Sequence, residues 1–313
     1  MLKSSHIQAG GRDIIISGKT IRTARIDGDS YRFFEDPEPI LEDLQKCGRR
    51  VDLFTFSQRL PDTSPRYRYP MDWDNVAAVE LTSFEHWWNK QIGNKTRNMV
   101  RQAEKKGVIV REVPLDDSLV RGIWEIYNES PIRQGRKFFN YGKTLDTVRG
   151  EAGTFLDCSV FVGAFFQDQL IGFTKLTIDE TGTQAGIMHI IAMLQHRDKA
   201  PTNALIAQAV RACSDRSIRY LVYSHFAYGN KTHDTLSDFK ERNGFKRVDV
   251  PRYYIPLSPI GHVARRLGLH LSVHHHIPEP LINAFRKYRA AWYGRRYSVP
   301  ATTGAGSNPV MGV

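Results

Sequence analysis

The sequence is poor in cysteine and has no long apolar run. Its three cysteines, Cys47, Cys158 and Cys213, lie far apart and form no CxxC pair, which excludes a disulfide framework and a cysteine-built metal site. The most apolar stretch, 160–173, is interrupted by Gln-Asp-Gln and falls short of the ~20 residues that a spanning helix needs. The first seven residues have no apolar core after their lysine, so we expect no secretory signal and a reduced, cytoplasmic protein.

Glycine and proline are also too scarce for a collagen-like or wholly disordered chain. There are 24 glycines and 15 prolines in 313 residues, and 41% of the residues are hydrophobic. This composition indicates a globular protein with a large core. At roughly 100–200 residues per domain, the length allows one large domain or two medium ones.

Positive charge is in excess, but it is unevenly distributed. The formal net charge is +11, and residues 261–313 carry seven Lys or Arg side chains against Glu279 alone. The C-terminal region therefore contributes +6 of the total, and the body is only mildly basic. A basic chain suits nucleic acid, a membrane surface or an anionic substrate.

Apolar periodicity predicts alternating strands and helices along the whole chain. In the first part we expect strands at 13–17, 21–26, 51–56 (half-buried) and 76–81, a short helix after Pro39, and a helical run at 83–106 broken near Gly93. In the second part we expect helices at 116–127, 145–149, 202–213 and 234–242, and strands at 160–166, 170–178, 186–193, 220–223 and 245–257.

The element order from about residue 116 to 257, ending in Asn243-Gly244-Phe245, resembles the GNAT N-acyltransferase superfamily. The segment 94–108 is similar to the helix-then-strand entry of Fem-type proteins, GNAT-fold ligases that add amino acids to cell-wall precursors. Phe239-Lys240 followed by Gly244 is similar to their FK…G segment. The resemblance covers roughly residues 80–257. It implies an α/β (α+β) fold with a GNAT-like mixed central sheet flanked by helices.

The same resemblance suggests a division of the chain. We expect an N-terminal α/β region at 1–110, a GNAT-like acyltransferase domain at 111–258, a basic helical extension at 259–297 and a disordered tail at 298–313. Whether the N-terminal region is a degenerate GNAT-like half, which would give two tandem halves, stays open.

The resemblance also locates a donor site. In GNAT enzymes acyl-CoA runs along a splayed strand, and its pyrophosphate lies on the N-terminus of the next helix, where free N–H groups attract phosphate. The family pattern R/Q-x-x-G-x-G/A aligns with the segment 197–202. Ala200 and Thr202 stand where the family has glycine or a small residue, Pro201 removes an N–H donor, and Asp198 adds a charge that opposes phosphate binding. The cofactor-binding residues implied are Ile190, Ile191, Ala192, Arg197, Lys199, Ala200, Thr202 and Asn203. They imply acetyl-CoA or another acyl-CoA as co-substrate and no metal. An ordinary capped helix is the alternative.

Three residues are candidates for catalysis. Lys240 stands where many GNAT enzymes have a tyrosine general acid; a charged lysine there suits an oxyanion or a phosphate, and a solvated helix lysine is the alternative. His189 precedes the donor segment as a general base, or is a hydrogen-bonded core residue. Tyr223, like His225 and Tyr228, follows the strand beside which such folds open their acceptor cleft.

The loop from Pro131 to Tyr141 lies where GNAT proteins shape the acceptor side. Its three cations within five residues fit an anionic acceptor such as a nucleotide sugar, a lipid-linked precursor or an acidic saccharide, although a basic loop without a ligand has the same pattern. The substrate-binding candidates are Arg133, Arg136, Tyr141, Tyr228 and Asn230; the last two also fit a simple tight turn.

Two basic segments suggest macromolecular partners. The helix 95–106 clusters cations that suit tRNA, or it is a solvated face. A helix opening at Pro280 combines an apolar stripe with arginines, which suits peripheral contact with the inner membrane face, docking on its own domain, or a homodimer. His274-His275-His276 does not predict a metal site, because consecutive side chains cannot all reach one ion.

The leading functional hypothesis is an acyltransferase that moves an acyl group from acyl-CoA to an amine or hydroxyl of a small, cell-envelope or saccharide-related acceptor. One alternative is a Fem-like transferase that uses aminoacyl-tRNA and acts on a cell-wall precursor. The other is a non-catalytic GNAT-like scaffold, which the altered phosphate segment favours.

Overall fold

A computed structural model describes residues 4–227 and 235–271. The predictions for Tyr228, Asn230, the histidine triplet, the helix from Pro280 and the tail concern residues outside these ranges.

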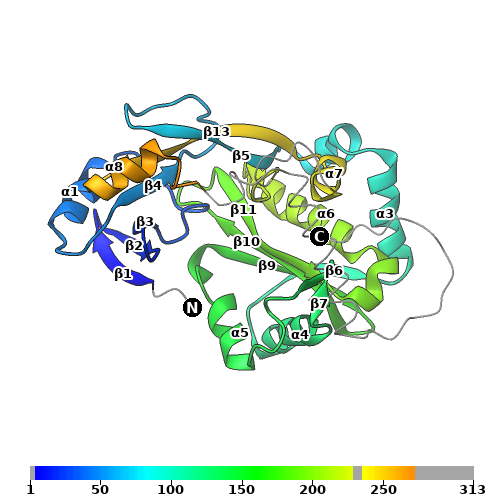
Figure 1. Cartoon of the computed structure of the whole chain (residues 1–313). Coiled ribbons are helices and arrows are strands. Elements are labelled where there is room, and N and C mark those ends of the chain that lie inside the picture. Colours follow the sequence, from blue (N-terminus) through cyan, green and yellow to red (C-terminus); the bar gives the residue numbers. More distant parts are fainter. Residues whose placement is uncertain (1–3, 228–234, 272–313) are drawn as a thin grey trace.

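One long mixed sheet organises the described chain (Figure 1). Its strand order is β1-β2-β3-β4-β13-β5-β12-β11-β10-β9-β6, and the pairs β3–β4 and β11–β12 are parallel while the others are antiparallel. The strands are β1 Ser5–Ala9, β2 Arg12–Ser17, β3 Thr23–Ile26, β4 Leu53–Ser57, β5 Met71–Glu80, β6 Ile109–Val113, β9 Ser159–Phe166, β10 Gln169–Ile178, β11 Gln184–Ala192, β12 Tyr220–Val222 and β13 Lys246–Pro256. A separate hairpin joins β7 Ile132–Arg133 and β8 Arg136–Lys137.

Helices cover both faces of this sheet (Figure 1). They are α1 Glu38–Lys46, α2 Phe84–His86, α3 Asn94–Lys105, α4 Asp117–Asn128, α5 Leu145–Ala152, α6 Pro201–Asp215, α7 Thr235–Arg242 and α8 Pro259–Arg266, with a π-helical turn at Trp87–Gln91 and 3₁₀ turns at Leu156–Cys158 and Leu194–Lys199. On β10, Gly172 faces Leu205 of α6, while the next residue, Phe173, packs against Tyr127 of α4. Neighbouring strand residues point to opposite faces, so α6 and α4 lie on opposite sides of the sheet.

Strand β13 connects the N-terminal strands to the rest of the sheet. It pairs with β4 on one edge and with β5 on the other, and its Tyr253 is fully buried among the aromatic rings of Phe56 and Tyr67. Residues 53–56 of β4 are all buried, because both faces of this strand are covered. Phe54 and Phe56 pack on one face into a core cluster that contains the apolar residues of α1, and Leu53 and Thr55 are buried on the other. The prediction of a half-buried strand at this position was therefore wrong.

The other predicted elements agree with the structure to within a few residues, with four differences. The strand β1 was not predicted. The helical run 83–106 is divided at Gly93 as expected, but it also contains the π-helical turn. The polar loop 130–141 contains the small hairpin, and the expected closing strands at 245–257 form a single strand. The division at residue 110, and the extension beyond residue 271, stay predictions.

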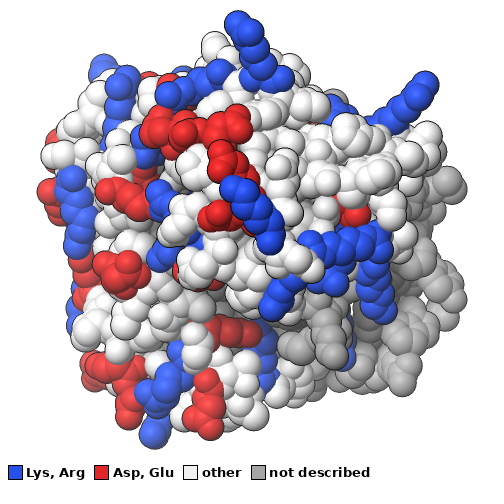
Figure 2. Space-filling view, turned by 90° about the vertical axis from the view of Figure 1, so that its left-hand side faces the viewer, with Lys and Arg blue, Asp and Glu red and all other residues white. Residues whose placement is uncertain are grey.

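Surface charge on the side formed by the N-terminal elements is of both signs. Figure 2 shows basic and acidic side chains interspersed there. Several are ion pairs, including Arg12–Glu180 at 2.7 Å and Arg66–Glu35 at 2.7 Å. Within the described ranges no helix is both long and apolar enough to cross a bilayer.

Candidate functional site

The strands β11 and β12 part soon after they begin to pair. Their parallel register joins residues 184–186 to 220–222, after which β12 ends and β11 continues to Ala192. One extra residue of β11, Met188, interrupts the register with β10, where Lys175 pairs with His189 but Leu176 pairs with Ile187. Such a bulge bends a strand and increases its twist, which turns the second half of β11 away from β12.

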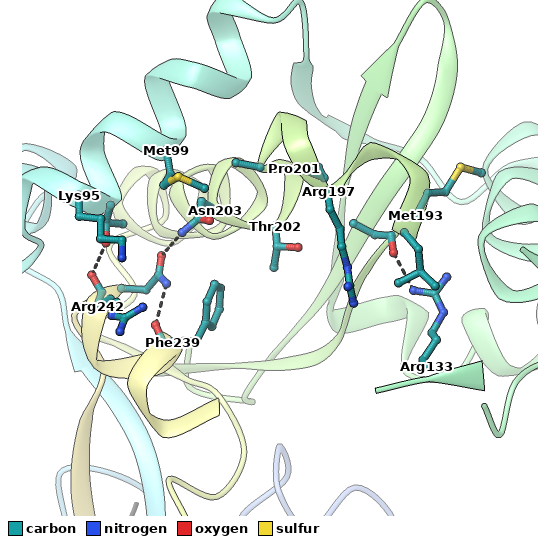
Figure 3. A pocket seen from close by; sticks show the side chains of 15 residues that line it. Lys95, Met99, Arg133, Met193, Arg197, Pro201, Thr202, Asn203, Phe239 and Arg242 are labelled. Atoms are coloured by element: carbon teal, nitrogen blue, oxygen red, sulfur yellow. Dashed lines mark hydrogen bonds between the residues drawn. The ribbon is translucent and has the colours of Figure 1, made fainter. Parts of the chain in front are cut away.

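A pocket with a strongly cationic lining lies at the end of β11 (Figure 3). We call it the cationic pocket; its volume is about 870 Å³. It is lined by Lys95, Thr96, Met99, Arg133, Ala192, Met193, Leu194, Arg197, Ala200, Pro201, Thr202, Asn203, Phe239, Arg242 and Asn243. This lining contains four cationic side chains and no carboxylate among the described residues.

The N-terminus of α6 forms one wall of the cationic pocket. Pro201 occupies its first turn, Ala200 is the N-cap in the left-handed conformation (φ 52°), and no side chain caps the helix. The first N–H groups of a helix have no partner within it and carry the positive end of its dipole. Thr202 and Asn203 belong to this turn and line the pocket, so this wall can bind an anion.

The four cations approach from two sides. In Figure 3, Lys95 and Arg242 lie on one side and Arg197 and Arg133 on the other. Arg133 is held in place: its guanidinium donates to the Ala192 carbonyl at 2.7 Å and to Glu129 at 2.9 Å. No hydrogen bond or ion pair joins the side chains of Arg197 or Lys95 to another described residue, which leaves both available to a ligand.

The end of α7 closes the pocket floor. The fully buried side chain of Asn243 donates to the Phe239 carbonyl at 2.8 Å and accepts from Asn203 at 3.3 Å. The Trp87 indole donates to the Asn243 carbonyl at 3.0 Å. Gly244 follows with φ 87°, the left-handed conformation that commonly ends a helix. The Asn-Gly-Phe motif of the sequence thus ties α7 to α6 and to the π-helical turn.

A second pocket, of about 610 Å³, is lined by Gly186 of β11 and Val222 of β12. The neighbours of these two residues, Ala185, Ile187 and Leu221, pack into the core that contains α6, so the pocket lies on the sheet face away from α6. We call it the histidine pocket; its lining is Ser30, Tyr31, Phe33, Ser57, Gln58, Leu60, Asp74, Val76, Gln184, Gly186, Val222, Ser224, His225, Val250 and Arg252. Within it the Arg252 guanidinium donates to Asp74 and to Asp29, both at 3.0 Å. His225 Nδ1 lies 3.2 Å from Asp74 Oδ1.

Ionisation in the histidine pocket is set by these contacts. Burial alone would raise the pKa of the Asp74 carboxyl, but hydrogen bonding by His225 and the charges of His225 and Arg252 outweigh it and hold this pKa well below its ordinary value. In return, the hydrogen bond to Asp74 raises the pKa of His225. Burial lowers the pKa of His189, and the nearby charge of Lys175 adds to this effect.

Lys240 is fully buried, so its reading as a solvated helix lysine was wrong. Its ammonium group donates to the carbonyl of His225 and lies 4.7 Å from the centre of the Tyr223 ring. Lys240, Tyr223 and His225 are therefore neighbours. His189 lies elsewhere, on the α4 side of β11, where its ring is 6.4 Å from that of Phe173. The catalytic roles of His189, Tyr223 and Lys240 stay predictions.

The structure gathers most of the predicted donor residues. Ala192, Arg197, Ala200, Thr202 and Asn203 line the cationic pocket, together with Arg133, which the sequence assigned to the acceptor side. Ile190 and Ile191 are half-buried against the core. Lys199 lies over the Phe166 ring at 4.6 Å and pairs with Asp198, outside the pocket lining. Arg136 and Tyr141 line neither pocket.

Sequence reasoning missed several residues of both pockets. Lys95 was considered for RNA alone, and Arg242 was not considered. Asp74 and Arg252 were also missed, although each carries a charge inside an otherwise strand-like segment, a pattern that deserved a structural explanation.

Comparison with known proteins supports the fold. The mixed sheet with a parted parallel strand pair and helices on both faces is GNAT-like, with Fem-type features, as the sequence predicted. One similar structure is FemX, which is 9% identical in sequence; the match covers 84% of this chain and 90% of FemX, with a TM-score of 0.53. Another is L-PGS from Bacillus licheniformis, which is 12% identical; the match covers 80% of this chain and 84% of L-PGS, with a TM-score of 0.54. A third is named as the C-terminal domain of a lysylphosphatidylglycerol synthetase from Agrobacterium fabrum. It is 13% identical, and the match covers 84% of this chain and 87% of that domain, with a TM-score of 0.53. No protein-family model and no curated protein sequence matches the chain.

Proposed function

We propose that this protein transfers an acyl group from an anionic donor, acetyl-CoA or another acyl-CoA, to an amine or hydroxyl acceptor. The observation that carries the proposal is the placement of the cationic pocket. It combines an uncapped helix end with four cations, and it lies at the end of the strand that parts from its neighbour.

The donor's phosphates fit the described groups. Arg197 and Lys95 supply positive charge, and the first turn of α6 at Thr202 and Asn203 supplies N–H donors. Ala200 is small enough for a phosphate to approach, although Pro201 removes one donor. The charge of Asp198, which opposes phosphate binding, is offset by an ion pair with Lys106 at 3.0 Å.

The acyl end of such a donor would lie along β11. Six residue steps, one of them taken up by the bulge at Met188, separate Ala192 in the cationic pocket from Gly186 in the histidine pocket. At ~3.3 Å per residue the other five span about 17 Å, comparable to an extended pantetheine arm. Transfer then needs a positioned nucleophile and a polarised carbonyl, without a covalent enzyme intermediate. We retain three proposed catalytic residues: Tyr223 and Lys240, close to the end of β12 where it parts from β11, and His189 on β11.

An aminoacyl donor is the second candidate. One of the similar structures is named as the C-terminal domain of a lysylphosphatidylglycerol synthetase, and this supports an aminoacyl group in place of a simple acyl group. An aminoacyl-tRNA would also present phosphates to the cationic pocket. However, two cations of α3 have other contacts: Arg97 donates to the Trp88 and Ile92 carbonyls, and Arg101 lies 5.7 Å from the Trp88 ring. This favours acyl-CoA as the first donor to test.

The remaining parts of the proposal concern the acceptor and the cellular location. We retain a saccharide-type or cell-envelope acceptor, contacts from Arg136 and Tyr141, and a cytoplasmic protein that approaches the inner membrane face. A homodimer is also retained.

Isothermal titration of the full-length protein with acetyl-CoA tests the donor site. We expect Arg197→Ala and Lys95→Ala each to weaken binding about tenfold or more, because a hydrogen bond to a charged group is worth ~1.5–3 kcal/mol. The matched controls are Arg121→Ala and Lys105→Ala, exposed cations outside the cationic pocket, which should leave the affinity unchanged.

The outcome separates the candidates. Absence of binding at millimolar acetyl-CoA would remove the CoA proposal. Tight, steeply salt-dependent binding of tRNA that is lost in Lys95→Ala would then favour the aminoacyl-tRNA donor. Donor binding without turnover of any acceptor would leave the non-catalytic scaffold.

A further inference from the structure

We infer that Glu129 and Arg133 are positioning residues for the donor: they fix the end of β11 and the turn that leads from it to α6, and they join this turn to the hairpin of β7 and β8. The inference rests on the proposed function, because it assigns roles beside the cationic pocket. It deepens that proposal, since it separates a cation that holds the pocket in shape from cations that are available to a ligand.

Glu129 holds the turn that follows β11. Its carboxylate accepts from the Leu194 N–H at 2.7 Å and from the Gln195 N–H at 2.9 Å, so one side chain binds the first two amides of the 3₁₀ turn. Such amides have no partner within their own turn, and leaving them unpaired away from water costs free energy. Leu194 also belongs to the lining of the cationic pocket. The carboxylate therefore fixes the backbone at which the donor site begins.

Arg133 joins the last residue of β11 to Glu129 and to α4. Its guanidinium donates to the Ala192 carbonyl at 2.7 Å (Figure 3), to Glu129 at 2.9 Å and to the Ile126 carbonyl in the last turn of α4 at 2.8 Å. These bonds use three of its five N–H donors, and a fourth, on Nε, is buried. Arg133 is thus committed to the protein, although it lines the cationic pocket.

The two side chains form a shielded ion pair. Arg133 is 11% exposed and Glu129 is 15% exposed. Their charges cancel, so together they contribute geometry to the donor site and no net attraction for an anion. Removal of one partner leaves the other as a largely buried charge without a counter-charge, which is costly. The pair therefore acts as a unit.

The far end of the same turn is anchored to α3. The Asp198 carbonyl accepts from Lys106 at 2.7 Å and from Gln102 at 2.9 Å, and its carboxylate accepts from Lys106 at 3.0 Å. Arg197 stands between the two anchored points, and its side chain forms no hydrogen bond or ion pair with another described residue. A group that binds a ligand has to be held within about 0.5 Å of its productive position. The anchors supply this constraint for Arg197.

The pair also reaches the loop that the sequence assigned to the acceptor side. Arg133 pairs with Arg136 across the hairpin of β7 and β8, and its guanidinium lies 4.9 Å from the centre of the Phe138 ring. Phe138 packs edge-on against Tyr127 of α4, with ring centres 5.8 Å apart. Arg133 thus contacts both the donor strand and the acceptor-side loop, which holds the two sides in a fixed relation.

Calorimetry with one neutralised carboxylate tests the role of Glu129. Acetyl-CoA is titrated into the full-length wild type, Glu129→Gln and the matched control Glu125→Gln, which removes the same charge from α4 outside the lining of the cationic pocket. The amide keeps a single acceptor oxygen for the two N–H groups. We therefore expect Glu129→Gln to weaken binding about tenfold or more, although it makes the region more positive. Glu125→Gln should leave the affinity unchanged.

Two other results would contradict this role. Tighter binding by Glu129→Gln would show that the carboxylate acts only as an opposing charge, and unchanged binding would show that it serves stability alone. The corresponding test of Arg133 is Arg133→Lys, which keeps the charge but lacks the planar fork that spans several acceptors. We expect a loss of about tenfold, beside no change in the exposed control Arg121→Lys. Full affinity in Arg133→Lys would mean that its charge alone matters.

Hydrogen exchange measured by mass spectrometry tests the link to the hairpin. In the wild type, saturation with acetyl-CoA should slow the exchange of the amides at 132–138, because a fixed end of β11 holds Arg133 and the hairpin with it. In Glu129→Gln, also saturated, this slowing should be smaller. The amides of α1, which contributes nothing to the pocket lining, should not respond in either protein. Equal slowing at 132–138 in the two proteins, or none in the wild type, would overturn the link.

The two proposals fail separately. If the wild type binds acetyl-CoA and Glu129→Gln binds it equally well or better, the donor site stands and the positioning role fails. If the wild type does not bind acetyl-CoA, the proposed function fails, and donor positioning fails with it. Near-UV circular dichroism establishes that each variant is folded. If Glu129→Gln does not fold, Arg133→Lys carries both tests.

Discussion

Replacing Ala200 by glycine should leave the stability of this protein nearly unchanged, although glycine usually weakens a helix. Ala200 is the N-cap of α6 and has φ 52°, a left-handed conformation in which a Cβ atom crowds the backbone. It is also part of the cationic pocket lining. The substitution therefore removes strain and a methyl group from the same place.

The expected size follows from three terms. Left-handed geometry costs an L-residue about 1–2 kcal/mol, and the variant is relieved of this cost. Against this relief stand the greater freedom of glycine in the unfolded chain, about 0.5–1 kcal/mol, and the loss of a methyl group that is only 5% exposed, about 0.8 kcal/mol. The three terms nearly cancel, so the free energy of unfolding should change by less than about 0.5 kcal/mol.

Urea denaturation and thermal unfolding of Ala200→Gly measure this change. The matched control is Ala207→Gly, the same change within α6, which should lose about 1 kcal/mol or more through helix propensity and lost packing. A nearly neutral Ala200→Gly beside a destabilising Ala207→Gly is the expected result. If Ala200→Gly is as destabilising as the control, the left-handed strain does not exist. We also expect tighter acetyl-CoA binding in Ala200→Gly, because phosphate can approach the helix end more closely.

Two further predictions concern other buried positions. Gly186→Ala should lower the free energy of unfolding by about 1–3 kcal/mol and narrow the histidine pocket, because the new Cβ would collide with the Tyr31 ring. The control is Gly150→Ala, in open space on α5, which should be neutral or stabilising. Similar losses of stability in both variants would contradict this reasoning. Burial lowers the pKa of the fully buried Lys175 to about 8, so between pH 8 and 10.5 the unfolded chain binds more protons than the folded one. The stability of the wild type should accordingly rise with pH across this window relative to Lys175→Met; parallel pH profiles from chemical denaturation would refute it.

Local patterns predicted most of the second half of the fold. The Asp116 cap of α4 accepts from the Leu119 N–H at 2.8 Å, as its place before an apolar helix indicates. The turn between β9 and β10 likewise has positive φ at Gln167 and Asp168. The partners of each strand were not predictable in this way. Periodicity shows that β4 is a strand, but it does not show that β4 pairs with β13, which lies about 200 residues later in the chain.

The candidate site, too, was only partly predictable from local sequence patterns. The donor segment 197–203 is continuous, so one motif found most of it. The other residues come from separate elements: Lys95 from α3, Arg242 from α7, and the cluster of Asp74, His225 and Arg252 from three different strands or their ends. No local spacing joins these residues. The position of β13 between β4 and β5 is what brings Arg252 to Asp74.

This position of β13 also has a consequence for biosynthesis. Among the described strands, β13 alone connects β1–β4 to the remainder of the sheet. A nascent chain therefore exposes unpaired edges on both β4 and β5 until residue 256 has left the ribosome. Messenger RNA truncated before codon 246 should yield ribosome-bound or released fragments that depend on chaperones, and the two halves should become protease-resistant together, only after synthesis is nearly complete.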